Sequence, residues 1–215
     1  MLIQQASTLS EKAYGILEEM IVTLKLDPGS VISETQLSRA IKIGRTPMRE
    51  ALQRLAGEGL VATLPRRGLI VSEINITQQL ALLETRRVLD RLVVCRAARR
   101  ASDSQREALK VCAAEMENAA RGKDLTDFMR LDREFDDIVE SASRNAFAVR
   151  ALAPLHVHCR RFWYMYHHNG DLTHSAALHV QVILAVAEAD EETAATSADR
   201  LIDYLEEFTR SAFDL

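Results

Sequence analysis

The 215-residue sequence has little of several features on which familiar protein classes depend. Its three cysteines, Cys95, Cys112 and Cys159, lie far apart and form no CxxC pair, which argues against a zinc ribbon. No run of about 18 apolar residues is present, so no membrane-spanning helix is expected. The N-terminus lacks a basic segment followed by an apolar one, so no signal peptide is expected. We therefore expect a reduced, cytoplasmic protein with no membrane partner.

The motifs of common enzyme classes are also missing. The sequence has no GxSxG nucleophile motif, no HExxH zinc motif and no phosphate-binding P-loop. Glycine and proline are nearly absent after Thr77, and long helical patterns dominate there. These absences predict a mainly α-helical protein that is not an enzyme.

The region 1–72 differs from the rest because short helices alternate with turns and a strand pair ends it. Capping residues and apolar spacing predict three helices, the second at about 33–40 and the third at about 45–58. Two β-prone runs, 60–64 and 68–71, flank a Pro-Arg-Arg turn and predict a hairpin. We interpret this order as an N-terminal winged helix-turn-helix domain that binds DNA.

The region 77–215 is predicted to be an antiparallel six-helix bundle that binds an effector and forms the dimer. Apolar residues recur there at helical spacing, and the links between helices are short. The predicted helices are Thr77–Arg100, Asp103–Arg121, Leu125–Ser143, Ala146–His167, Leu172–Ala189 and Glu191–Phe213.

Charge is distributed unevenly along the chain. The net charge is −4, yet the segment Arg39–Arg67 holds seven basic and two acidic residues. A local basic surface on an acidic protein is typical of a docking face for double-stranded DNA.

The third predicted helix has two faces. Its apolar face, with Met48 and Leu52, should pack on the first two helices. The other face carries donors that can reach guanine or phosphate in the major groove, and the hairpin tip can reach the minor groove. The predicted DNA-binding residues of these two elements are Arg45, Thr46, Arg49, Gln53, Arg66, Arg67 and Gly68. The alternative, a solvated basic helix and an ordinary turn, remains open on charge alone.

The helical region contains an inward polar cluster. Asp132 and Asp136 lie one turn apart on or beside the buried side of their helix, and two buried carboxylates need a cation or a donor. A metal could serve, and so could an arginine or histidine, which would also suit an anionic effector. The candidate effector-binding residues are Arg86, His156, Arg160 and Trp163. In the alternative reading, Asp136 is solvated and His179 is a core histidine.

The run Gly44-Arg45-Thr46-Pro47-Met48-Arg49-Glu50-Ala51-Leu52, followed by Glu58-Gly59-Leu60-Val61 and Pro65-Arg66-Arg67-Gly68, resembles the winged helix-turn-helix of GntR-type bacterial regulators. The resemblance implies that Arg45, Thr46 and Arg49 contact operator DNA and that the wing around Gly68 approaches the minor groove. Two positions depart from the family pattern. Gly44 replaces a common serine, and Lys42 replaces a common glycine, which implies an added phosphate contact.

The helical region resembles the FCD-type effector domain of the FadR branch, in its six-helix, VanR-like form. The resemblance rests on Arg86-x-x-x-Asp90, Asp132-x-x-Phe135-Asp136 and Leu178-His179. It implies a divalent metal at the positions Asp132, Asp136, His179 and Asp203, where aspartates replace two of the usual histidines. Zinc, nickel and manganese stay open, and oxygen-rich ligation favours harder ions such as manganese or magnesium.

The leading hypothesis is a ligand-responsive bacterial transcriptional regulator that binds a palindromic operator as a homodimer. Two alternatives stay open. One is a metal-dependent enzyme in the helical bundle with an accessory DNA-binding head. The other is an architectural DNA binder that senses no ligand.

Overall fold

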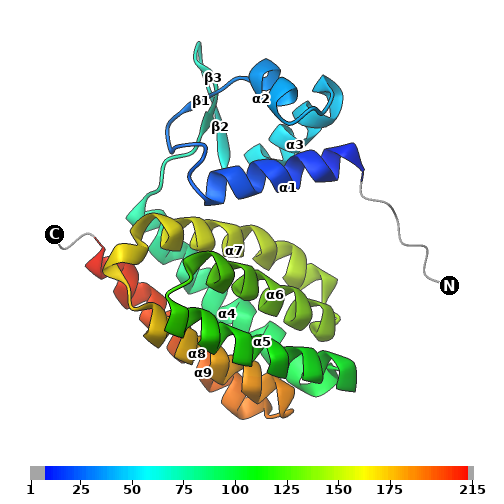
Figure 1. Ribbon diagram of the computed structural model, residues 1–215, viewed down its shortest axis with the longest axis vertical. Coiled ribbons are helices and arrows are strands. Elements are labelled where there is room, and N and C mark those ends of the chain that lie inside the picture. Colours follow the sequence, from blue (N-terminus) through cyan, green and yellow to red (C-terminus); the bar gives the residue numbers. More distant parts are fainter. Residues whose placement is uncertain (1–7, 213–215) are drawn as a thin grey trace. The chain divides into compact units, whose positions relative to one another are not determined.

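The computed structural model describes residues 8–212 (Figure 1). Contacts divide the chain into two compact units. The first unit contains the residues before Ile76 together with Val157–Met165, and the second contains Ile76–His156 and the residues from Tyr166 onward. One helix, α7 (Ala146–Tyr166), therefore supplies residues to both units.

The first unit holds a winged helix-turn-helix, as the sequence predicts. Its elements are α1 (Leu9–Val22), β1 (Val31–Ile32), α2 (Glu34–Ala40), α3 (Arg45–Gly57), β2 (Val61–Leu64) and β3 (Gly68–Val71). The strands form an antiparallel sheet in the order β1-β3-β2. The hairpin β2–β3 is the predicted one, whereas the short strand β1 was not predicted.

Local chemistry explains where the helices of this unit begin and end. Thr8 forms a capping box with Glu11 at the start of α1. Ser33 caps α2 by accepting a hydrogen bond from the amide of Gln36. Gly59 follows α3 with φ +79°, a conformation that glycine adopts without strain.

The core of this unit forms where α1 packs on α3. Leu17 and Ile21 of α1 and Met48 and Leu55 of α3 are fully buried. Because these apolar residues fill one side of α3, its polar residues must lie on the opposite, solvent-facing side.

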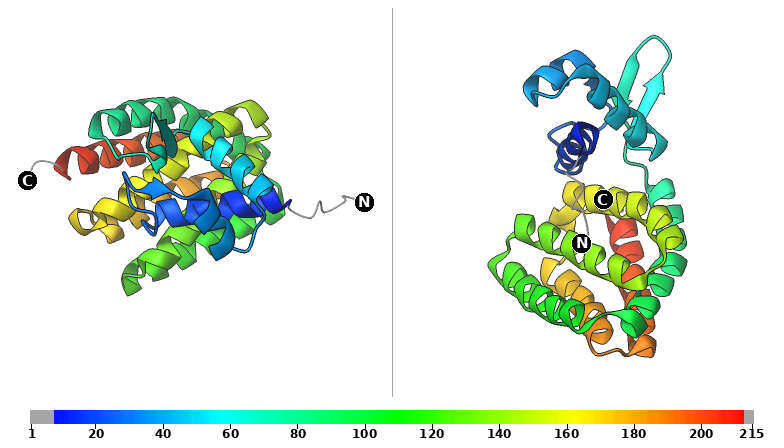
Figure 2. Two further views of the ribbon diagram at one scale, coloured as in Figure 1. Left: turned by 90° about the horizontal axis from the view of Figure 1, so that it is seen from above. Right: turned by 90° about the vertical axis from the view of Figure 1, so that its right-hand side faces the viewer.

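The second unit is the predicted bundle of helices, shown from two further directions in Figure 2. Its helices are α4 (Ile76–Arg100), α5 (Asp103–Gly122), α6 (Leu125–Ser143), the first half of α7, α8 (Leu172–Ala187) and α9 (Glu191–Ser211). Helix α4 packs against α6, α8 and α9, and α5 packs against α6 and α8. The predicted bounds hold to within about two residues, and the predicted end at Phe213 lies outside the described residues. None of the helices in the range 8–212 is long and apolar enough to cross a membrane.

Candidate functional sites

The structure places every predicted DNA-binding residue at the surface of the first unit. Four of them share α3 and stand opposite its buried apolar side, and the others occupy the turn before α3 and the tip of the β2–β3 hairpin. The exposed residues are Lys42, Arg45, Thr46, Arg49, Gln53, Arg66, Arg67 and Gly68. Within residues 8–212, Arg45 forms no hydrogen bond or ion pair with the protein and is available to a ligand.

The two departures from the family pattern have visible structural consequences. Gly44 is the N-cap of α3 and provides no side-chain hydrogen bond, so the first amides of that helix stay open to an anion. Lys42 adopts φ 56°, a left-handed conformation that favours glycine and strains a lysine. Lys42 thus places an exposed ammonium group at a position whose backbone conformation is unfavourable for lysine.

The other arginines of α3 differ in how firmly the protein holds them. Arg49 donates to Glu34 Oε2 from Nη2 at 3.2 Å and from Nε at 3.4 Å, and its side chain remains 63% exposed. Arg54 stacks on the Tyr14 ring at 3.7 Å and bonds to Glu58 Oε1 at 3.0 Å. Arg54 therefore fastens α3 to α1, while Arg49 stays on the exposed face.

The second unit contains a buried ion-pair chain centred on His156 of α7. Its Nε2 lies 3.0 Å from Asp90 Oδ1, and its Nδ1 lies 2.9 Å from Asp136 Oδ2. Arg86 Nε donates to the other Asp90 oxygen at 2.9 Å. Of the partners that the sequence left open for Asp136, the structure thus supplies His156, and Arg86 pairs with Asp90 instead.

The opposite charges within the ion-pair chain stabilise one another. Burial lowers the pKa of His156, but the Asp136 and Asp90 carboxylates outweigh burial and leave it well above the ordinary value. Burial raises the pKa of Asp90, but Arg86 and His156 outweigh that effect and leave it below its usual range. Both ring nitrogens of His156 face carboxylates, so the imidazolium form fits this site best.

A small cavity of about 20 Å³ adjoins the ion-pair chain. Arg86, Asp90, Asp136 and His156 form its polar wall. The rest of its lining is apolar: Val93, Val94, Phe135, Val139, Leu152, Val182, Ala198 and Leu201. A space of this size holds about one water molecule, so a larger ligand requires the surrounding helices to separate.

A second buried histidine, His179 of α8, has separate partners. Its Nδ1 lies 2.7 Å from the Ser175 carbonyl oxygen, and its Nε2 lies 3.1 Å from Asp132 Oδ1. The ring makes edge-on contacts with Phe128 and Phe135. Burial lowers its pKa, but the bond to Asp132 outweighs this and leaves the pKa raised. The arrangement matches the alternative of a hydrogen-bonded core histidine.

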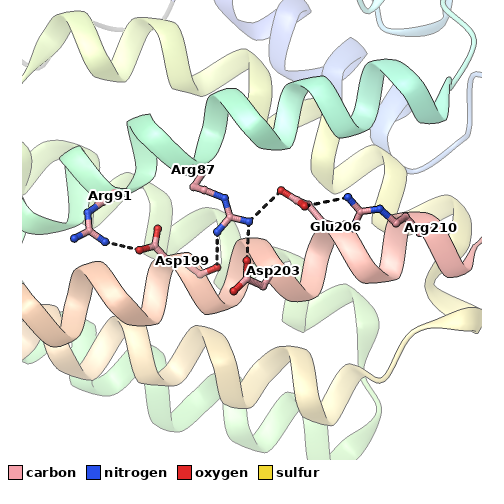
Figure 3. A network of polar contacts seen from close by, with 6 residues as sticks. All are labelled: Arg87, Arg91, Asp199, Asp203, Glu206 and Arg210. Atoms are coloured by element: carbon pink, nitrogen blue, oxygen red, sulfur yellow. Dashed lines mark hydrogen bonds and ion pairs between the residues drawn. The ribbon is translucent and has the colours of Figure 1, made fainter.

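Asp203 is wrongly placed in the predicted metal set. Its carboxylate pairs with Arg87 at 2.7 Å on the outer side of α4 and α9, and its side chain is 68% exposed (Figure 3). There it joins a surface network with Glu206 and Arg91, because α4 and α9 run antiparallel with charged residues facing each other. Asp132 lies beside His179 and Asp136 beside His156, so the four predicted ligands do not meet at one point, and within residues 8–212 no group of three His, Cys, Asp or Glu side chains is arranged to hold a metal ion. The residues present therefore do not fit the metal that the family resemblance implies.

The predicted effector residues are only partly brought together. Arg86 and His156 line the cavity, whereas Arg160 and Trp163 do not. Both of these are buried on the part of α7 that belongs to the first unit. Asp90 was not among the predicted site residues, although its spacing four residues after Arg86 predicts an ion pair on one face of the helix.

An exposed arginine-bearing helix, held by two others beside a basic-tipped hairpin, defines a DNA-binding protein of the winged helix-turn-helix class. The sequence profile of the bacterial regulatory proteins of the gntR family matches residues 9–71, and that of the FCD domain matches residues 81–204. The chain belongs to the GntR family of bacterial regulatory proteins and carries an FCD domain. It is a transcriptional regulator, and neither the family nor the relatives support the enzyme alternative.

Individual relatives agree with this assignment. The chain is 27% identical to the Nta operon transcriptional regulator of Aminobacter aminovorans over 80% of its own length and 81% of the relative's. It is 31% identical to the HTH-type transcriptional repressor RspR of Escherichia coli over 61% of its length and 58% of the repressor's. The solved structure of E. coli McbR/YncC shares its fold, with a TM-score of 0.85 at 16% identity over 97% of this chain and 100% of that one.

Proposed function

We propose that this regulator binds a palindromic operator as a homodimer and changes that binding when a small effector enters the second unit. The observation that carries the DNA-binding part is the solvent-facing row of Arg45, Arg49 and Gln53 on a helix whose opposite side is buried. Such a helix can lie in the major groove, with Lys42 and the wing arginines on the phosphates or in the minor groove. One helix reads a half-site, so a palindrome calls for two copies.

The experiment is selection of bound duplexes from a randomised DNA pool with the full chain, followed by anisotropy titrations. Arg45→Ala should abolish most enrichment. Arg200→Ala is the matched control, because it removes one exposed arginine from α9 in the other unit. Equal enrichment by both variants would show that Arg45 of α3 does not contribute to DNA binding. Light scattering with and without the selected duplex tests the two-copy stoichiometry.

The effector part of the proposal is supported by the cavity beside His156 and Arg86. We expect an effector with an apolar body and one carboxylate, because the lining is mostly apolar and a carboxylate can take the place of Asp90 on Arg86. The ion-pair chain needs no metal for its charge balance, so no metal enters this proposal.

Adjacent arginines provide a matched test of the effector site. Short aliphatic carboxylates and their primary amides are screened by thermal shift on the wild type, on Arg86→Met and on Arg87→Met. Arg86 lines the cavity, whereas Arg87 lies in the surface network with Asp203. We expect an acid-specific stabilisation that survives in Arg87→Met and is lost in Arg86→Met. If the stabilisation is lost in both variants, or in neither, the effector does not bind at Arg86.

A further inference from the structure

An acidic side chain lies on the same surface as the DNA-binding arginines. Glu34 is the first residue of α2, and its Oε2 accepts both bonds from Arg49 of α3. The Glu34 side chain is 32% exposed and the Arg49 side chain 63% exposed, so solvent or DNA can reach both. A carboxylate on a face that meets phosphates weakens DNA binding in general. We therefore asked whether the position of Glu34 beside Arg49 improves another property of DNA binding.

The contact with Glu34 fixes the orientation of the Arg49 guanidinium. Glu34 engages Nε and Nη2, which lie along one edge of the planar guanidinium. Within residues 8–212 the Nη1 group of Arg49 has no hydrogen-bond partner, so the adjacent Nη1–Nη2 edge keeps one free N–H on each nitrogen. Bidentate recognition of guanine O6 and N7 requires two donors held in one plane. Fixing one edge of the guanidinium therefore orients the edge that would read a base.

We infer that Glu34 is a specificity-determining residue, which holds Arg49 in a base-reading orientation and keeps it from settling on phosphates. An arginine on a flexible side chain can neutralise any nearby phosphate, and this gives affinity without sequence preference. Glu34 lowers that sequence-independent affinity and leaves the base contact, so it widens the gap between operator and other DNA. The inference rests on the proposed function that α3 enters the major groove.

The test compares two acidic residues of the same surface. The wild-type chain first selects its preferred duplex from a randomised pool, and dissociation constants are then measured for that duplex and for a scrambled one. Glu34→Ala is compared with Glu50→Ala. Glu50 is an exposed acid next to Arg49 on α3, and it has no ion pair among the described residues.

Glu34→Ala should reduce the ratio of scrambled to selected dissociation constants by roughly tenfold, the scale of one bidentate base contact. Weaker binding to the selected duplex and tighter binding to the scrambled duplex should both contribute to that loss. Glu50→Ala should tighten both duplexes equally and leave the ratio unchanged. Glu34→Gln, which keeps the shape and an acceptor, should retain an intermediate ratio and guards against a folding defect in the alanine variant.

In a chain that already carries Arg49→Ala, Glu34→Ala should no longer change the ratio of scrambled to selected dissociation constants. Equal ratios for Glu34→Ala and Glu50→Ala, with the wild type selecting a clear sequence, would overturn this inference and leave the proposed function intact. Failure of the wild type to select any sequence would overturn the proposed function and this inference with it.

Discussion

If Lys42 contacts a phosphate, as proposed, the substitution Lys42→Gly should weaken DNA binding and at the same time stabilise the fold. The residue adopts φ 56°, and a left-handed conformation costs a non-glycine residue about 1–2 kcal/mol. Glycine removes that strain, but it increases the freedom of the unfolded chain, which subtracts about 0.4–1 kcal/mol. The net expectation is a free energy of unfolding raised by about 0.5–1 kcal/mol. Denaturant titration of the full chain measures it.

The same substitution should weaken DNA binding. Loss of one phosphate contact should reduce the slope of log affinity against log salt by about 0.9. Lys42→Ala is the matched control, since it removes the ammonium group and keeps a side chain at the strained position. It should lose the same salt slope without gaining stability. If Lys42→Gly is no more stable than Lys42→Ala, the strain argument is refuted; if the salt slope stays unchanged, Lys42 does not contact phosphate.

Four other predictions follow from described contacts. Arg49→Ala should weaken binding to the selected duplex by about 1–3 kcal/mol in anisotropy titrations, and unchanged binding would exclude a base contact. Tyr14→Phe removes the 2.7 Å bond to Glu58 and should lower the free energy of unfolding by about 1–2 kcal/mol, with DNA contacts intact. His156→Gln should destabilise the chain by about 3–5 kcal/mol near neutral pH, because it removes the cationic ring that lies between the buried carboxylates of Asp90 and Asp136. The folded-state pKa of His156 is raised, so its contribution is complete below the unfolded-state pKa and is lost as pH rises through the folded value. The difference between wild type and His156→Gln in urea should therefore shrink at alkaline pH, and a difference that grows with pH would contradict the ion pairs. EDTA should leave the melting temperature unchanged, and a fall restored by manganese or zinc would reinstate a metal.

The sequence predicts those features of the fold that depend on neighbouring residues. Helix bounds follow apolar spacing and caps, and both are local signals. Strand β1 was missed because Val31 and Ile32 give too short a pattern, and their pairing with β3 joins residues almost forty positions apart. The exposed row on α3 was predictable because one amphipathic helix determines which of its residues face solvent.

Side-chain contacts between different helices could be predicted less well from the sequence. The spacing of Asp132 and Asp136 showed that both needed partners, but helix packing decides that each aspartate meets a different histidine. Asp203 was assigned to the interior by family resemblance, whereas Arg87 on the antiparallel neighbour holds it at the surface. Contacts of this kind depend on how α4, α6, α7 and α9 are rotated about their axes, which no local pattern specifies.

The charge balance around His156 constrains how an effector could act. In the present arrangement the cavity holds about one water, and the nearby carboxylates already have cationic partners. An effector can shift the protein only if it binds another arrangement more tightly, and here that arrangement must have wider helix spacing and Arg86 or His156 released from its carboxylate. Helix α7 supplies His156 to one unit and Val157–Met165 to the other. If the effector binds beside the ion-pair chain, as proposed, the contacts of Arg86 and His156 are those that must differ between the two arrangements.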